Sequence, residues 1–389
     1  MDHYMIGWGH TRFGKHTDCD IESLITQAAG EALEDAGVDA AEIDAIYLGH
    51  FNSGMSPQDF CAPLVLQVDE RLRFKPATRV ENACASGSAA LHQGLNHLAS
   101  GAARRVLVVG VEKMTDAGAA QVADSLLGAS YRRSDLVETS LGFAGVFARI
   151  AQAYFDAYGD QSDVLARIAA KNHHNGARNP YAHLQNDFGF DFCNTESAKN
   201  PVVAAPLRRT DCSPVSDGAA AVVLSDASGL ANARRAVGFR SRVQATEFMP
   251  MARRDLTELE GAAHAWRQAM QHAGVGLDDL SFAEVHDCFT IAELMIYEAI
   301  GLTPKGEGRR AIEEDWVTVD GRLPVNPSGG LKAKGHPVGA TGVSMHVMAA
   351  KQLTGEAGDM QVASPQLGAV FNMGGVAVAN YASVLERAR

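Results

Sequence analysis

The sequence predicts a mixed α/β fold built from two similar halves. Apolar, strand-like runs alternate with amphipathic helical patterns along most of the 389 residues. Residues 104–111 are almost continuously apolar, as expected of a strand that is buried on both faces. Two glycine-rich segments, one around Cys84 and one around His336, resemble each other although they lie far apart in the chain. Similarity over such a distance indicates a duplicated domain.

The individual elements follow from the same patterns. In the first half we expect strands at 5–9, 43–48, 76–80, 104–111 and 219–224, and helices at 21–36 and 89–98. In the second half we expect strands at 236–245, 282–285, 367–372 and 376–385, and helices at 256–273, 291–300 and 343–353. Within the first half, between the strands at 104–111 and 219–224, the alternation lapses, with helical patterns at 145–158 and 164–176. Residues 304–323 show little periodicity, which predicts a solvated excursion.

These patterns divide the chain into three parts. Residues 1–115 and 206–240 form the expected N-terminal half, 241–389 the C-terminal half, and 116–205 an inserted loop domain. The repeat extends beyond its two central segments, because 43–51 resembles 280–289 and 219–225 resembles 376–385. If the halves pack about a pseudo-twofold axis, the helix starts that follow Cys84 and His336 converge. A thiol would then face an imidazole, which is the arrangement that an activated cysteine needs.

The segment around Cys84 is typical of a nucleophile at the start of a helix. It follows a predicted strand and precedes small residues and a helical stretch. A thiol there lies in the positive end of the helix dipole, which favours the thiolate. Gly87 lets a substrate approach the backbone, whose free N–H groups could hold an oxyanion. The alternative is a small buried cysteine in a tight contact between helix and sheet.

Four ordered motifs carry a family resemblance that covers nearly the whole chain. They are ENACASG at 81–87, HDCF at 286–289, GHPVGATG at 335–342 and NMGG at 372–375. Together they resemble the thiolase superfamily, and the HDCF tetrad resembles its sterol-carrier-protein-type and acetyl-CoA acetyltransferase-like members. Most thiolases have an asparagine where His286 stands and a second catalytic cysteine where Asn372 stands. In this chain, Cys288 offers a replacement thiol.

The resemblance implies a five-layered αβαβα fold of two pseudo-symmetric mixed-sheet halves, and a thiolase reaction that forms or cleaves a 3-oxoacyl-CoA. Cys84 would be the nucleophile, His336 its base and Cys288 the second acid/base. One oxyanion hole would use His336 with a group held near His286, and the other the backbone N–H groups of Cys84 and Gly374. The alternatives are a packed core thiol for Cys288, a satisfied core histidine for His286, and a turn cap for His336.

The same resemblance implies coenzyme A and its acyl esters as substrates, with no permanently bound cofactor and no metal. Ser328 and Gly329 are candidates for the wall of the pantetheine channel. Basic residues of the insertion, among them Lys171, are candidates for the phosphates, although a solvated charged face is the better explanation for any single one of them. Family analogy predicts a homodimer or homotetramer and allows a small accessory protein.

Two other functions stay open at this point. One is a carbon–carbon lyase or C-acyltransferase of thiolase fold that acts with a partner protein. The other is an acyl- or lipid-binding module without chemistry. The retained Cys84, Cys288 and His336 favour an enzyme, because a binding module has no need of all three.

Composition excludes several classes of protein. A net charge of −12 argues against a nucleic-acid binder. No apolar run reaches the length of a membrane span. The six cysteines contain no CxxC pair, and no secretory signal precedes them, so we expect reduced thiols in the cytoplasm. The histidines of the insertion lack the spacing of metal ligands.

Overall fold

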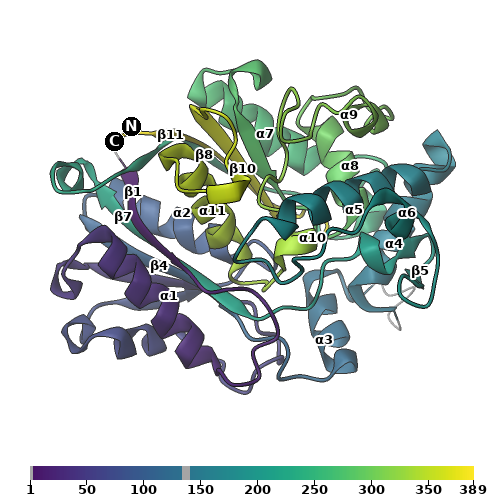
Figure 1. Cartoon of the computed structure of the whole chain (residues 1–389). Helices are drawn as coiled ribbons and strands as arrows, with labels where there is room; N and C mark the ends of the chain where they lie inside the picture. Colours follow the sequence, from purple (N-terminus) through teal and green to yellow (C-terminus); the bar gives the residue numbers. More distant parts are fainter. Residues whose placement is uncertain (1–2, 134–140) are drawn as a thin grey trace.

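The computed structural model describes residues 3–133 and 141–389 (Figure 1). In the first half, the strands are β1 (His3–His10), β2 (Ala45–Gly49), β3 (Ala77–Val80), β4 (Arg105–Glu112) and β7 (Gly218–Asp226), and the main helices are α1 (Ile21–Ala36) and α2 (Ser86–Ala99). In the second half, the strands are β8 (Val237–Thr246), β9 (Phe282–Val285), β10 (Leu367–Gly374) and β11 (Ala379–Arg387), and the main helices are α7 (Glu260–Ala273), α8 (Thr290–Ala299) and α11 (Thr341–Thr354).

The two halves share one strand topology. The first half has the order β3-β2-β4-β7-β1, and the second half continues it as β8-β11-β10-β9. Each half has a parallel pair (β2 with β4, β10 with β9) and continues from it with two antiparallel strands. The β1–β8 pairing that joins the halves is short, with Tyr4 opposite Gly238 and Met5 opposite Val237. The predicted duplication is therefore confirmed, with the addition that the two halves form one continuous sheet.

Helices α2 and α11 pack against each other in the middle of the molecule (Figure 1). Helix α2 contacts β2 and β4, whereas α11 contacts strands of both halves, β7 and β10 among them. Helix α1 covers the outer face of the first half, and α7 covers β8 and β11. The approach of the two central helices requires glycine, because a Cβ on Gly87 would lie 2.8 Å from the carbonyl oxygen of Gly339. This arrangement is the expected five-layered one.

Local signals explain why helix α1 begins and ends where predicted. The side chain of Asp20 accepts a hydrogen bond from the backbone N–H of Ser23, which caps the start. Gly37 ends the helix in the left-handed conformation at φ 62°. The apolar residues of α1 all face the sheet of the first half, where Leu24 and Ile25 are buried.

The insertion folds into helices that lie on one side of the sheet. They are α3 (Ala119–Leu126), α4 (Gly142–Tyr158), α5 (Ser162–Ala177) and α6 (Phe190–Asn194), followed by the hairpin β5 (Val202–Ala204) and β6 (Leu207–Arg208). Strand β8 belongs to the second half because it pairs with β11. We therefore keep the three-part division as a proposal, with the boundary between the halves moved to a point before Val237.

The segment 304–323 departs from its prediction. It contains a short helix, α9 (Arg309–Glu313), and Ile312, Val317 and Leu323 are buried in the main hydrophobic core. The apolar residues that cover the core are isolated within a polar stretch. Because they do not recur at a regular spacing, the hydrophobic pattern did not predict their burial. The segment is an excursion whose inner side is packed rather than solvated.

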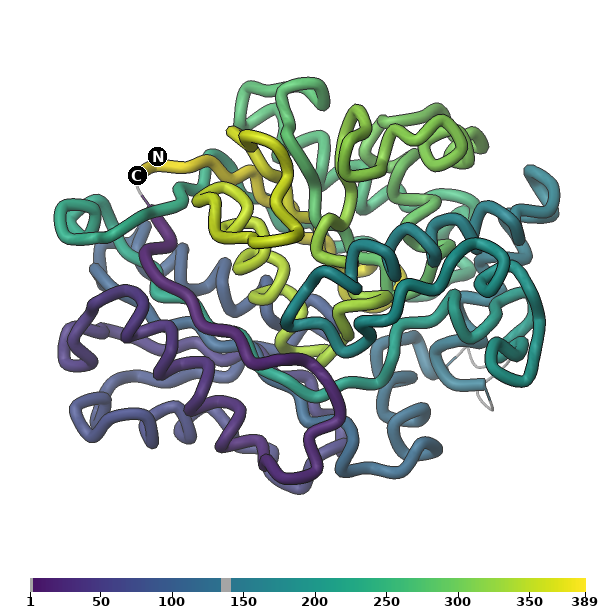
Figure 2. The backbone as a smooth tube through the Cα atoms, viewed as in Figure 1, coloured from purple at the N-terminus to yellow at the C-terminus, as the bar shows by residue number. Residues whose placement is uncertain are grey.

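Strand β8 has β1 on one side and β11 on the other, so the two ends of the chain come together (Figure 2). Within 3–133 and 141–389, the structure contains no helix that is both long enough and apolar enough to cross a membrane.

Candidate active site

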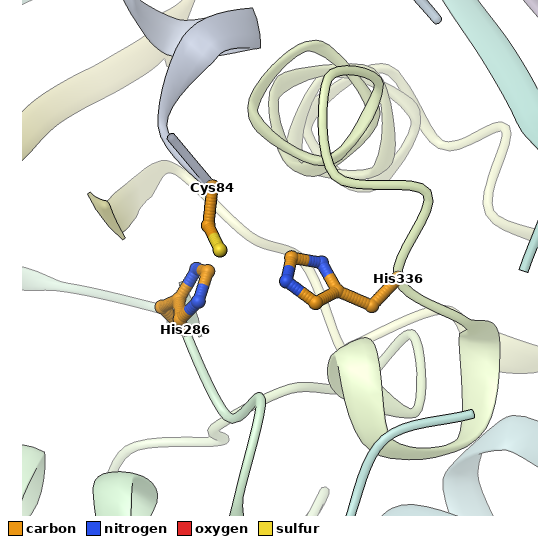
Figure 3. Close-up of side chains that lie close together, drawn as sticks. All are labelled: Cys84, His286 and His336. Carbon is orange, nitrogen blue, oxygen red and sulfur yellow. The ribbon is translucent and has the colours of Figure 1, made fainter. Parts of the chain in front are cut away.

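Three side chains from three separated segments meet between the halves. Cys84 lies in the turn between β3 and α2, His286 directly follows β9, and His336 lies between α10 (Gly330–Lys334) and α11. The Cys84 sulfur and one nitrogen of each ring lie within 4.8 Å of one another. The two imidazoles meet edge to face, with ring centroids 5.2 Å apart, and the sulfur points toward them (Figure 3).

The backbone that presents Cys84 is strained and held by side chains. Ala83 adopts φ 51°, which is uncommon for a residue other than glycine. The hydroxyl of Ser86 donates to the carbonyl of Ala83 at 2.7 Å and accepts from the N–H of Asn82 at 2.9 Å. The amide of Asn82 in turn donates to the hydroxyl of Tyr381, at 2.8 Å, in the other half. These bonds fix the turn so that the thiol projects into the site.

Hydrogen bonds determine which nitrogen of His336 carries the proton. Its Nδ1 lies 2.6 Å from the hydroxyl of Thr341, and that hydroxyl donates its single proton to the carbonyl of Pro337 at 3.0 Å. With the hydroxyl proton on that carbonyl, Nδ1 donates to Thr341 and Nε2 is left unprotonated. Nε2 is buried and has no partner. His336 thus offers a free lone pair, as a general base requires.

His286 has the opposite tautomer. The amide nitrogen of Asn372 lies 2.8 Å from Nδ1 of His286 and also donates to the carbonyl of Cys84 at 3.3 Å. An amide nitrogen only donates, so Nδ1 accepts and Nε2 carries the proton. That buried N–H has no partner, and His286 is therefore not a satisfied core histidine. It offers a free donor where His336 offers a free acceptor.

Burial keeps both partners of the proposed pair neutral. Burial raises the pKa of the Cys84 thiol to about 12. The backbone N–H groups of Gly375 and of Cys84 itself favour the thiolate and partly offset this rise. Burial and the nearby Lys334 ammonium lower the pKa of His336 to about 3. The helix start and the backbone N–H groups favour the thiolate, but desolvation outweighs them. Cys84 needs a base to ionise, and the free nitrogen of His336 is within reach.

An apolar cavity of about 490 Å³ opens beside these groups. Cys84, Cys288 and His336 line it, together with Ser213 and with apolar side chains such as Phe143. Cys288 is buried, and desolvation and the nearby Cys84 raise its pKa. Cys288 lines the same cavity as Cys84. The alternative that Cys288 is only a packed core thiol explains why it is buried, but it does not explain this position.

Three sequence-based assignments need correction or extension. Ser328 and Gly329 are not among the residues that line this cavity, because Ser328 bonds to Glu284 at 2.7 Å and Gly329 packs against α5. Gly374 does approach the nucleophile turn, since a Cβ on it would lie 2.3 Å from the carbonyl of Asn82. The N–H of Gly375 favours the ionised sulfur, so it adds a neighbouring donor, and the role of Gly374 toward an oxyanion stays a prediction. In the sequence, the only sign of the Gly375 donor is that this residue is the second glycine of the NMGG motif.

The aspartate of the HDCF motif connects the two segments of the second half that carry His286 and His336. Asp287 accepts hydrogen bonds from the N–H groups of Leu331 and Lys332, at 2.6 and 3.2 Å, at the start of α10. It also accepts from Asn172, which bonds in turn to Glu293. Lys171 forms a buried ion pair with Glu293 at 2.6 Å, so it is not available to a phosphate.

Glu112 makes the corresponding connection between the halves. Its carboxylate accepts from the N–H groups of Phe51 and Asn52 in the first half and from that of Gly339 in the second, at 2.9–3.0 Å. It also lies 3.2 Å from Nε2 of His50. Sequence reasoning missed this residue, because a glutamate at the end of a strand has no local signature.

Comparisons with known proteins agree with this geometry. The thiolase N-terminal domain model matches residues 3–228, and the thiolase C-terminal domain-like model matches 244–387. An acetyl-CoA acetyltransferase of Methanothermobacter thermautotrophicus is 38% identical, over 95% of this chain and 96% of its own length. Benzoylsuccinyl-CoA thiolase subunit BbsB of Thauera aromatica is 32% identical, over 92% and 91%. Human sterol carrier protein 2 is 28% identical, over 95% of this chain and 69% of its own.

Solved structures agree in fold. The Ltp2-ChsH2(DUF35) aldolase matches all of this chain and 98% of its own, with a TM-score of 0.84 at 21% identity. A monomeric SCP2-thiolase-like protein of Mycobacterium smegmatis matches 99% of this chain and 77% of its own, with a TM-score of 0.74 at 18% identity. The chain therefore belongs to the thiolase family of acyltransferase enzymes.

Proposed function

We propose that this protein is an acyl-CoA C-acyltransferase that forms or cleaves 3-oxoacyl-CoA through an acyl-cysteine on Cys84. The observation that supports this most is the pair of unpartnered ring nitrogens beside the thiol. His336 presents a lone pair and His286 an N–H, so the site holds a base and an oxyanion donor around one nucleophile. An acyl- or lipid-binding module has no use for two buried unsatisfied imidazole atoms, which are costly to keep.

In the cleavage direction, His336 takes the proton of Cys84, and the sulfur attacks the 3-oxo carbonyl. The N–H groups of His286 and of protonated His336 stabilise charge on substrate oxygen during the cycle, and the backbone around Cys84 and Gly374 supplies a second set of donors. The C2–C3 bond then breaks. Its electron pair stays on C2, which takes the proton of Cys288.

The acyl group then leaves Cys84 for coenzyme A. The Cys288 thiolate accepts the proton of the coenzyme A thiol, whose sulfur attacks the acyl-cysteine. Cys84 leaves as a thiolate and recovers its proton from His336. Condensation is the same sequence in reverse. Thiol and imidazole groups supply every proton transfer, so the proposal needs coenzyme A and its acyl esters only as substrates.

The test is a thiolysis assay across short, branched, aryl and sterol-derived 3-oxoacyl-CoA substrates, with consumption of free coenzyme A measured alongside. We expect stoichiometric consumption with at least one class, and loss of activity in Cys84→Ala, His336→Ala and Cys288→Ala. Cys19→Ala is the matched control, since Cys19 is a partly exposed free thiol on another surface. A Cys288→Ala enzyme with full activity would remove that residue from the mechanism.

A second candidate is a carbon–carbon lyase that acts with a partner protein. It rests on the fold match to an aldolase that was solved together with its DUF35 partner. A lyase would release an aldehyde or ketone without consuming coenzyme A, so the same assay separates the two functions. If the chain alone is inactive, a small accessory protein becomes part of this proposal.

The expected assembly is a homodimer, or a tetramer formed from two dimers. Strand β3 is at the edge of the sheet, directly before the Cys84 turn, and is only partly buried. Phe60 and Phe74 are 74% and 86% exposed. An open strand edge and exposed aromatic rings are typical of a surface that a second copy covers. All six cysteines are free thiols, which supports a cytoplasmic location.

A further inference from the structure

A second cavity lies behind one wall of the active site. Its volume is about 690 Å³, and it shares the wall residues His183, Cys212, Ser213 and Val215 with the catalytic cavity. Cys84, Cys288 and His336 do not line it. The proposed reaction therefore assigns it no role.

The deepest charge in this cavity is Lys332, which is 1% exposed. Two other buried lysines, Lys113 and Lys171, form ion pairs with carboxylates at 3.0 and 2.6 Å. Within the described part of the chain, Lys332 has no such partner. Its Nζ contacts Nε2 of His173 at 3.3 Å, and the nearby carboxylate of Asp211 is already bonded to Thr290. The carboxylates of Asp211 and Asp287 act on Lys332 only from a distance, and a buried ammonium without a direct ion pair is costly to maintain.

His173 adds a second free donor. The Lys332 ammonium can only donate, so Nε2 of His173 accepts and the ring proton is on Nδ1. That atom is buried, in a side chain 1% exposed, and has no partner. Among the described residues, the Lys332 ammonium has one acceptor for its three N–H groups and the Nδ1–H of His173 has none. These nearly inaccessible donors line one cavity, which indicates that the cavity is built around an anion.

The rest of the lining has the same character. Lys199 and Arg209 line the exposed side of the cavity and form no ion pair among the residues that the structure describes. No described aspartate or glutamate lines the cavity, although the chain has a net charge of −12. Phe188 and Phe192 stack with ring centroids 4.5 Å apart, and His173 meets Phe188 edge to face. This aromatic pair offers a flat apolar surface beside the cations.

We propose that this cavity binds an organic anion, with a phosphate or carboxylate at Lys332 and His173 and a planar ring against Phe188. The inference does not rest on the reaction at Cys84. Ligands of this chemistry come from two sources: the phosphoadenosine end of coenzyme A, and a free anionic aromatic metabolite. In the first case the cavity is part of the substrate site, and in the second it is a separate site behind the catalytic wall.

Calorimetric titration of the full chain tests this with adenosine 3′,5′-bisphosphate and with benzoate as probes. We expect at least one probe to bind, and Lys332→Met to weaken that binding by about tenfold or more, since charge-assisted hydrogen bonds are the strong ones. Arg209→Gln, an exposed change that leaves the interior intact, should weaken it about threefold. Lys75→Met is the control, because Lys75 is partly exposed and donates to the carbonyl of Ala41 elsewhere on the molecule. This variant should bind the probe like the wild type.

Repeating the titration with acetyl-CoA present, in the Cys84→Ala variant, separates the sources. Displacement of the bisphosphate by acetyl-CoA places the nucleotide end in the cavity, and binding of either probe beside acetyl-CoA indicates a separate ligand. Failure of both probes to bind the wild type at millimolar concentration would overturn the proposal. The proposal would also be overturned if Arg209→Gln and Lys332→Met both bound the probe as tightly as the wild type. For this comparison, the Lys332→Met protein must show native circular dichroism.

Discussion

The two halves of the molecule have the same strand topology but contribute different chemistry. In the first half, the turn before the central helix α2 presents a thiol, and in the second, the segment before α11 presents an imidazole. The second half also places His286 after β9, where the first half has His50, which is paired with Glu112 instead. The comparison teaches that duplication supplied a symmetric frame, and that the site arose from asymmetric substitution at equivalent positions of that frame.

The outer strand marks a second difference between the halves. The first half ends in the open strand β3, whereas the second half has at that place only an isolated bridge between Ala283 and Val325. The packed segment 304–323 leads into that bridge, and Val325 bonds back to Val317 at 3.1 Å. Within the described residues, the first half therefore leaves the edge strand β3 unpaired on one side, whereas the second half has covered its own edge.

The largest effect should come from removing the contribution of either half to the nucleophile pair. Cys84→Ala and His336→Ala should each lower kcat for thiolysis by about 10⁴-fold or more, because the thiol is not ionised without its base. The double variant should be little worse than either single one, since residues that act as a unit are not additive. Additive losses measured by steady-state kinetics would show that the two groups act independently.

A smaller effect should follow from removing the donor that only the second half supplies. His286→Ala should lower kcat by about 10²- to 10³-fold through loss of one oxyanion donor. His286→Asn should recover part of that loss, because its amide keeps a donor in the same region. Asn372→Ala frees the tautomer of His286 and should fall between His286→Ala and the wild type. A His286→Ala enzyme with unchanged kcat would exclude this role.

The connection between the halves should appear in the pH dependence of stability. Burial lowers the pKa of His50, but the Glu112 carboxylate outweighs burial and raises that pKa to about 9. The pair therefore stabilises the fold fully below the unfolded histidine's pKa near 6.5, and this contribution is lost as pH rises through about 9. Glu112→Gln should lower the free energy of unfolding by about 3 kcal/mol at pH 6. Urea denaturation at pH 6 and pH 10 checks this, and an equal difference at both values would contradict it.

The contact between the central helices should give the smallest effect. Gly87→Ala adds a Cβ 2.8 Å from backbone atoms of the opposite half and should cost about 1–3 kcal/mol. Gly30→Ala is the matched control, because a Cβ there meets only the end of Val68 at 3.8 Å. It should stabilise α1 by about 0.5–1 kcal/mol. Thermal unfolding measures the change in stability of each variant relative to the wild type. If both variants were stabilised, or both destabilised, the tight contact between the central helices would be contradicted.

Local patterns were enough to predict much of the fold. Asp20 and Gly37, the two residues that flank α1, determine where the helix begins and ends. The nearly continuous apolar run of β4 is a buried strand because its neighbours cover both faces. The internal repeat then predicted that Cys84 and His336 converge, since equivalent positions of two packed copies approach their common axis.

The remaining features depend on contacts between distant segments, which the sequence does not reveal. The roles of His286 and His336 follow from hydrogen bonds to Asn372 and Thr341, and only coordinates show which ring nitrogen each one meets. The sequence shows that the helix dipole favours a thiolate at Cys84, but it does not show how strongly burial by other elements opposes ionisation. Ser328 and Gly329 precede the His336 segment in sequence, yet the chain turns them away from the cavity. Sequence gave no sign of the basic cavity around Lys332 either.

The central claim is that a thiol from one half and an imidazole from the other act as one pair. Single-turnover acylation by acetyl-CoA, followed by mass spectrometry of the intact protein and its peptides, tests it most directly. We predict one acetyl group on the peptide that contains Cys84, formed at the same rate in Cys19→Ala and about 100-fold more slowly or not at all in His336→Ala. Acetylation of another residue, or an unchanged rate in His336→Ala, would contradict the claim.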